Sequence, residues 1–201
     1  MSKIKEKQRE KEQKLLDTAF DLFISKGIHE TTIQDIVKDA GVAKGTFYLY
    51  FRDKYDIMNV LTLRKTVTLF EEAIKSSHKI NYKNFTEQFL FIIDYIINAL
   101  SEDKKLLKFI YKNLSVGIYN THFQTELKDN FQTNASKLLF EMFKKRADED
   151  ELNLPNPQIT FFMIIELVGS TCYTSILFNS PVPIEEYKPY LYQTIEKILR
   201  P

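Results

Sequence analysis

Lys44, Thr46, Tyr48 and Tyr50 form a polar group near the N-terminus, in a segment whose apolar residues can build a small core without them. A solvent-facing tyrosine pair beside a lysine and a threonine is unusual for an ordinary surface. Against a DNA duplex it is natural, because hydroxyl and ammonium groups reach phosphates and base edges. Lys44 would prefer the O6 and N7 atoms of guanine in the major groove.

Two short helices joined by a tight turn must hold these side chains. Thr31 or Thr32 offers a capping hydroxyl for a helix that runs through Asp39, and a second short helix is expected over 43–50. The break between them is Ala40-Gly41-Val42, and two short helices with a glycine in the turn form the helix-turn-helix layout. The expected core residues are Ile33, Ile36, Val37, Val42 and Phe47.

The rest of the chain is also expected to be helical, because only five glycines and six prolines occur in 201 residues. Apolar periodicity predicts a first helix over 8–26 that ends at Gly27, and Asp53 is the expected cap of a helix over 54–77. Further helices are expected over 85–100, after Ser101, from a break at Gly117 to 144–146, over 158–178 and over 184–200. The fold class is therefore all-α. A three-helix helix-turn-helix domain is predicted over residues 1–53, and a larger helical domain over 54–201.

The segment 10–55 closely resembles the DNA-binding domain of the TetR family of bacterial repressors. The matching residues are Gly27, Thr31-Thr32, Ile36, Ala40-Gly41-Val42, Gly45-Thr46, Tyr48, Phe51 and Lys54. The rest of the chain resembles the family only in length and helical layout. Ala43 stands where the family usually has serine, so a hydroxyl that could cap the second short helix is missing.

The resemblance implies roles for individual residues against a double-stranded DNA operator. Lys44 and Thr46 are the candidates for base contacts, whereas the expected phosphate contacts are Thr32, Tyr48, Tyr50 and Lys54. Residues 1–14 carry six basic and three acidic side chains, a local net charge of +3. This basic end is compatible with phosphate contact, but it is equally compatible with a solvated, frayed terminus.

A small-molecule pocket and a homodimer interface are expected in the second domain. Large aromatic rings leave irregular gaps between helices and offer flat walls to a hydrophobic ligand. The pocket candidates are Phe89, Phe109, Tyr119, Phe123, Phe131, Phe162 and Glu166. The helix over 158–178 is apolar on nearly all sides, which indicates burial, and with the helix over 184–200 it is expected to form a two-fold interface. The interface candidates are Phe161, Gly169, Ser170, Tyr187, Leu191 and Ile195.

Glu166 leaves alternatives open, because a buried acid needs a partner or becomes protonated. It could contact a ligand, face solvent, or pair with a basic residue across the dimer. An enzyme that uses Glu166 in an apolar pocket is a weaker alternative, because no second catalytic group accompanies it. An architectural DNA-binding protein without a ligand is a further alternative.

Other reactive side chains carry no site. His29, His78 and His122 are scattered, so neither a metal nor another cofactor is expected. The single cysteine, Cys172, is expected to be a buried small hydrophobe, which fits a reducing cytoplasm. Asp148–Glu151 is expected to be a solvated loop. The charged N-terminus does not resemble a signal peptide, and no apolar run approaches the roughly 20 residues of a membrane span.

Together these features predict a cytoplasmic, ligand-responsive transcription regulator that acts as a repressor. It is expected to bind a near-palindromic operator as a homodimer and to be released by a small hydrophobic or aromatic molecule.

Overall fold

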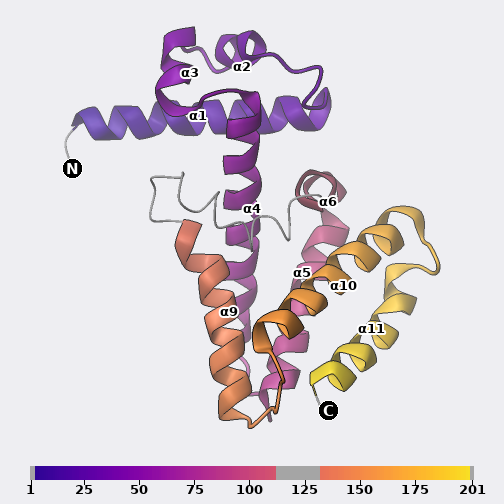
Figure 1. Cartoon of the computed structure of the whole chain (residues 1–201). Helices are drawn as coiled ribbons and strands as arrows, with labels where there is room; N and C mark the ends of the chain where they lie inside the picture. The colour runs from indigo at the N-terminus through magenta and orange to yellow at the C-terminus, as the bar shows by residue number, and fades with distance from the viewer. Residues whose placement is uncertain (1–2, 112–131, 200–201) are drawn as a thin grey trace. The chain divides into compact units, whose positions relative to one another are not determined.

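Every regular element is an α-helix in the computed structural model, which describes residues 3–111 and 132–199 (Figure 1). The helices are α1 (Lys3–Ser25), α2 (Ile33–Asp39), α3 (Lys44–Tyr50), α4 (Lys54–Ser77), α5 (Phe85–Glu102), α6 (Lys104–Ile110), α9 (Gln132–Glu149), α10 (Pro157–Phe178) and α11 (Ile184–Leu199). The all-α prediction is therefore confirmed. The expected break at Gly117 lies outside the described residues.

Residues 1–62 form the first of two compact units, and residues 63–201 form the second. In the first unit, α1 packs against α2 and α3, and α2 packs against α3. Its buried core includes Leu15, Leu16, Ala19, Leu22, Phe23, Ile36, Val37, Phe47, Phe51 and Ile57. The predicted domain boundary after residue 53 lies just before α4, whereas the division between the compact units falls within α4.

Local capping signals explain where the first helices begin and end. Gly27 adopts a positive φ of 85° and its N–H donates to the Phe23 carbonyl, so it ends α1 as expected. Thr32 caps α2 through a reciprocal pair of hydrogen bonds with Asp35. The Asp53 carboxylate accepts hydrogen bonds from two backbone N–H groups in the first turn of α4, at 2.8 Å each.

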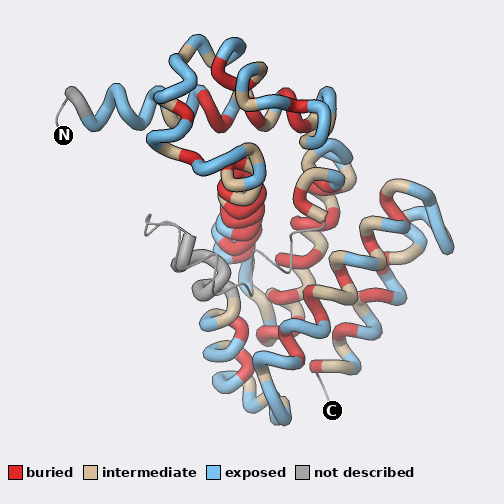
Figure 2. Tube along the Cα trace, turned by 45° about the horizontal axis from the view of Figure 1, so that its top comes forward, coloured by how far each residue is buried: buried red, intermediate tan, exposed pale blue. Residues whose placement is uncertain are grey.

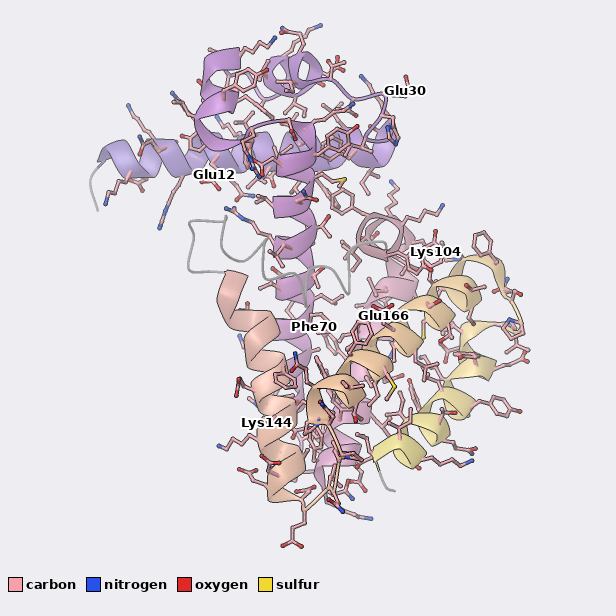
Figure 3. The ribbon with its side chains drawn as sticks, in the orientation of Figure 1. Glu12, Glu30, Phe70, Lys104, Lys144 and Glu166 are labelled. Atoms are coloured by element: carbon pink, nitrogen blue, oxygen red, sulfur yellow. The ribbon has the colours of Figure 1, made fainter. Side chains whose placement is uncertain are left out.

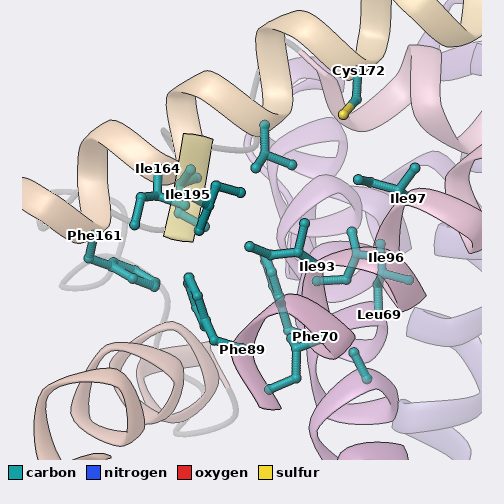
Figure 4. Close-up of a cluster of buried hydrophobic side chains, with 14 of the residues drawn as sticks. Leu69, Phe70, Phe89, Ile93, Ile96, Ile97, Phe161, Ile164, Cys172 and Ile195 are labelled. Carbon is teal, nitrogen blue, oxygen red and sulfur yellow. The ribbon is translucent and has the colours of Figure 1, made fainter. Parts of the chain in front are cut away.

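The second unit buries a continuous hydrophobic core among α4, α5, α6, α9, α10 and α11. Figure 2 shows the buried positions along each helix, and Figure 4 shows part of the core, including Phe89, Phe161 and Ile195. Four phenylalanine rings meet at its centre: Phe143 lies 5.5, 5.2 and 5.1 Å from Phe85, Phe89 and Phe161 between ring centroids. These aromatic side chains fill the space between α5, α9 and α10.

Several predicted ends in the second unit were wrong. Ser101 lies inside α5 and donates to the Ile97 carbonyl, whereas Asp103 caps α6 by accepting from two N–H groups. Asp148 and Glu149 belong to the last turn of α9, so the predicted loop starts later. The carboxylate of Asp150 then accepts a hydrogen bond from the backbone N–H of Phe85. This acidic stretch is therefore tied to α5 and is not simply solvated.

The helix α10 was expected to be buried on all sides, but its sides differ. Phe161, Ile164, Ile165 and Val168 are buried, whereas Ile159, Phe162 and Met163 are exposed. Among the described residues, α10 alone is long and apolar enough to cross a membrane by length and composition, which corrects the expectation that no such segment exists. In the structure one side of α10 packs on α5, α6, α9 and α11, as in the core helix of a soluble domain.

Candidate nucleic-acid interface, effector pocket and dimer face

The side chains of α3 are oriented by a small aromatic anchor. Gly41 turns the chain with a φ of 66°, and the Val42 N–H donates to the Val37 carbonyl across the turn. Phe47 is completely buried, and its ring centroid lies 5.6 Å from that of Phe51. Because Phe47 faces inward, the positions about half a turn away must face outward.

The outward face of α3 consists of Lys44, Gly45, Tyr48 and Leu49, all of them exposed. Tyr48 is 53% exposed and Leu49 is 80% exposed, which is unusual for residues with so much apolar surface. Thr46 is half-buried between the two faces. A helix that presents a cation, a phenol and an aliphatic group together can contact phosphates, base edges and thymine methyl groups.

Leu49 and Gly45 were missed as candidates, although helical spacing could have identified both. Leu49 follows Gly45 by four positions, as Tyr48 follows Lys44, so each pair shares one side of α3. A Cβ atom built on Gly45 meets no atom within 4 Å, so the chain itself does not require glycine there. As the missing hydroxyl at Ala43 led us to expect, α3 has no side-chain cap.

Two of the predicted phosphate contacts make internal hydrogen bonds. The Tyr50 hydroxyl donates to the Gln8 carbonyl of α1 at 3.0 Å. Burial and the nearby charge of Glu12 raise the pKa of Tyr50. The ammonium of Lys54 donates to the carbonyls of His29 and Thr31, at 2.9 and 3.0 Å. Lys54 therefore holds the chain between α1 and α2 to the start of α4.

Thr32 is exposed, but its hydroxyl is engaged with the Asp35 side chain and backbone in the cap of α2. Among the six predicted DNA contacts, Lys44 and Tyr48 thus lie together on an open surface. Thr32, Tyr50 and Lys54 organise the domain around them, and Thr46 lies at the border. Their contacts with DNA remain predictions.

An apolar pocket, partly open to solvent, lies between α5, α6 and α10. It is lined by Ile96, Ile97, Leu100, Leu107, Ile110, Tyr111, Val168, Gly169, Cys172, Tyr173 and Ile176. The rings of Tyr111 and Tyr173 are stacked with centroids 3.5 Å apart. No charged side chain lines this pocket among the residues that the structure describes.

The predicted pocket residues do not line this space. Phe89 is buried in the aromatic core, Phe109 is half-buried, and neither Phe162 nor Glu166 is among the lining residues. Tyr119, Phe123 and Phe131 lie outside the described residues. Aromatic content was the signal for the prediction, whereas the lining is mostly aliphatic. Gly169 and Cys172, two small residues three positions apart on α10, would have indicated the position of this pocket better.

The outer face of α10 begins with Ile159, Phe162 and Met163, which are 54%, 41% and 50% exposed. Glu166 and Ser170 continue the same side at helical spacing, and Figure 3 labels Glu166 on this helix. Glu166 is half-buried there. The three apolar side chains are exposed on a helix whose other side is in the core.

Three of the predicted interface residues are internal. Phe161, Leu191 and Ile195 are almost completely buried within the chain itself, so they cannot contact a partner without unfolding. Gly169 lines the pocket, Ser170 is exposed and Tyr187 is half-buried. The surface available to a partner therefore comes from their neighbours on α10 and α11.

A buried lysine with two more exposed acidic partners links α11 to α5. The Lys188 ammonium lies 3.2 Å from the Asp94 carboxylate and 3.1 Å from that of Glu185, and it donates to Asn98. Burial lowers the pKa of Lys188, but its hydrogen bonds and the charges of both acids outweigh burial and raise the pKa overall. A buried lysine with these partners fixes the register of α11 on α5.

Comparisons with known proteins agree with this geometry. The family model described as bacterial regulatory proteins, tetR family, matches residues 15–61. The chain is 25% identical over 187 residues to an HTH-type transcriptional regulator of Staphylococcus aureus strain USA300, covering 91% of both chains. It is 30% identical over 107 residues to the HTH-type regulator YdgC of Bacillus subtilis strain 168, covering 52% of this chain and 55% of YdgC.

Solved structures share the fold over nearly the whole chain. A TetR-family regulator of Syntrophomonas wolfei superposes with a TM-score of 0.65 at 22% identity, covering 95% of both chains. The fatty acid degradation regulator FadR of Bacillus halodurans superposes with a TM-score of 0.64 at 19% identity, covering 91% of this chain and 96% of FadR.

Proposed function

The chain belongs to the TetR family of transcription regulators, and we propose that it represses transcription as a homodimer on a near-palindromic operator until a small hydrophobic molecule releases it. Its relatives are regulators, so the chain is a regulator and not an enzyme. The proposed place of action is the cytoplasm, where the DNA is.

The observation that carries the DNA-binding proposal is the outward face of α3. Lys44, Tyr48 and Leu49 are exposed together on a helix whose inner face is anchored by Phe47. Exposed apolar side chains that lie together are typical of a surface that contacts a partner. A major groove admits one α-helix and offers acceptors to Lys44 and methyl groups to Leu49.

The test is operator binding by single variants of this face. The operator is first selected from a random duplex library. Lys44→Ala and Tyr48→Ala are each expected to weaken binding by roughly 1–3 kcal/mol, and Lys44→Ala should also relax base preference at one position. Raising salt should weaken binding steeply. Lys105→Ala, an exposed lysine on α6, is the control and should change nothing. Equal affinities for all proteins would remove α3 as the binding element.

A second copy of the chain is the proposed partner of the outer face of α10. The exposed Ile159, Phe162 and Met163 form an apolar stripe of the kind that self-association covers. A two-fold dimer would present two copies of α3, which need a separation of about 34 Å to enter successive major grooves. For that reason the operator is expected to be nearly palindromic.

The proposed effector site is the pocket between α5, α6 and α10. Its aliphatic lining and stacked tyrosines suit a hydrophobic chain or flat ring without a charged group. Glu166 is not in the lining, so no preference for cations is expected. An effector that fits only one arrangement of these helices would shift the protein towards a state that does not fit DNA. Operator DNA must then weaken effector binding by the same factor.

Cys172 offers a direct measure of pocket occupancy. Burial raises the pKa of its thiol to about 12, against smaller opposing effects from Thr171 and Lys188. Because thiolate is the reactive form, iodoacetamide should label the folded protein at pH 8 at least ~100-fold more slowly than the unfolded chain. Fatty acyl and flavonoid-like compounds that slow labelling further should also release the operator. A compound that protects Cys172 at saturation but leaves operator affinity unchanged would refute the switch and favour the architectural alternative.

A further inference from the structure

Residues 5–11 of α1 contribute nothing to the hydrophobic core. Residues 5–11 are all exposed, and the first buried side chain of the helix is Leu15. This stretch carries Lys5, Lys7, Arg9 and Lys11 against Glu6 and Glu10. Helices in proteins usually gain their stability by packing an apolar face against a core, and residues 5–11 pack no such face. A partner with the opposite charge is one source of that stability.

Tyr50, the last residue of α3, links this part of α1 to α3. Its hydroxyl donates to the Gln8 carbonyl at 3.0 Å. Burial raises the pKa of Tyr50, and the nearby charge of Glu12 raises it further. The side of α1 that carries Glu12, which is labelled in Figure 3, is therefore turned towards the C-terminal end of α3.

Lys5 and Arg9 lie on that same side of α1. Lys5, Arg9 and Glu12 follow the i, i+4, i+7 spacing that places residues above one another on a helix. Lys7 and Lys11 each lie two positions further along, which is about 200° around the helix axis. The basic residues of the stretch are thus divided between a side towards α3 and a side away from it.

Two cations at i and i+4 repel each other slightly in an isolated helix. A row of phosphates attracts both cations, so the pair becomes favourable when DNA is bound. We infer that Lys5 and Arg9 bind backbone phosphates of duplex DNA that flank the bases contacted by α3. This inference rests on the proposed DNA binding by α3. It depends on the side chains of Lys5 and Arg9 and on the hydrogen bond by which Tyr50 positions α1. The contact lies outside the helix-turn-helix itself.

The test compares two double variants that remove the same charge from the same helix. Lys5→Gln with Arg9→Gln should reduce the slope of log affinity against log salt by about 3.6, because the dimer loses four phosphate contacts and each contact releases about 0.9 counterion. At low salt its operator affinity should fall roughly tenfold. Lys7→Gln with Lys11→Gln, the matched control, should change the slope by less than half as much. Circular dichroism of both variants should match the wild type.

An operator trimmed of its flanking base pairs gives a second measurement. The wild type should lose affinity for it, whereas the Lys5/Arg9 variant should bind trimmed and full operators equally. If both double variants change the slope equally, the net charge of α1 alone determines the salt dependence, and the proposed contacts of Lys5 and Arg9 with flanking phosphates are refuted. No change in either variant also overturns it while leaving DNA binding by α3 intact. A wild type without sequence-specific binding would overturn the proposed function itself.

Discussion

Phe162→Glu should convert the dimer to a monomer and weaken operator binding at least ~100-fold, because a buried unpaired charge costs several kcal/mol at an interface. Phe162 is 41% exposed beside Ile159 and Met163, and circular dichroism of the variant should match the wild type. Sedimentation velocity at micromolar concentration measures the association state, and binding to the selected operator measures its consequence.

Phe178→Glu is the matched control for this variant. Phe178 is also on α10 and is 65% exposed, but it lies 16 positions along, about 160° around the helix from Phe162. The control protein should remain dimeric. A wild type that sediments as a monomer would refute the dimer, and a dimeric Phe162→Glu protein would exclude this face as its interface.

Phe161→Ala should cost roughly 3–5 kcal/mol of unfolding free energy, the usual loss for a buried phenylalanine. The Phe161 ring lies 5.1 Å from Phe143, 5.7 Å from Phe140 and 6.4 Å from Phe89 between centroids. Its removal leaves a cavity where α5, α9 and α10 meet. Urea unfolding followed by circular dichroism at fixed protein concentration is the measurement, since dimerisation also contributes to stability. Phe178→Ala should lose less than about 1 kcal/mol. A similar small loss for Phe161→Ala would contradict the description of the core.

The different roles of Phe161 and Phe162 illustrate why the second domain was harder to predict. An amphipathic helix reveals its inner face through the period of its apolar residues, but α10 is apolar almost all round. Sequence periodicity therefore could not separate the two rings. Only the packing of α5, α9 and α11 on one side of α10 assigns Phe161 to the core.

The first domain was largely predictable because its signals are local. The capping hydroxyl of Thr32, the positive φ of Gly27 and the inward Phe47 each act within a few residues. The roles of Tyr50 and Lys54 depend on hydrogen bonds across 42 and 25 residues respectively, which no local pattern encodes. The lining of the pocket between α5, α6 and α10 likewise brings together three helices, which no local pattern encodes.

At Gly45, the stability of α3 and its close approach to DNA favour different residues. Alanine at an ordinary helical position is more favourable than glycine by roughly 0.5–1 kcal/mol, and the space around Gly45 accepts a methyl group. A surface that must lie against a DNA groove, in contrast, benefits from the closest possible approach of the backbone. A laboratory selection for heat resistance alone would therefore enrich alanine at position 45 and yield sturdier proteins that repress poorly. Counter-selection on an operator-controlled reporter would be needed to keep the glycine.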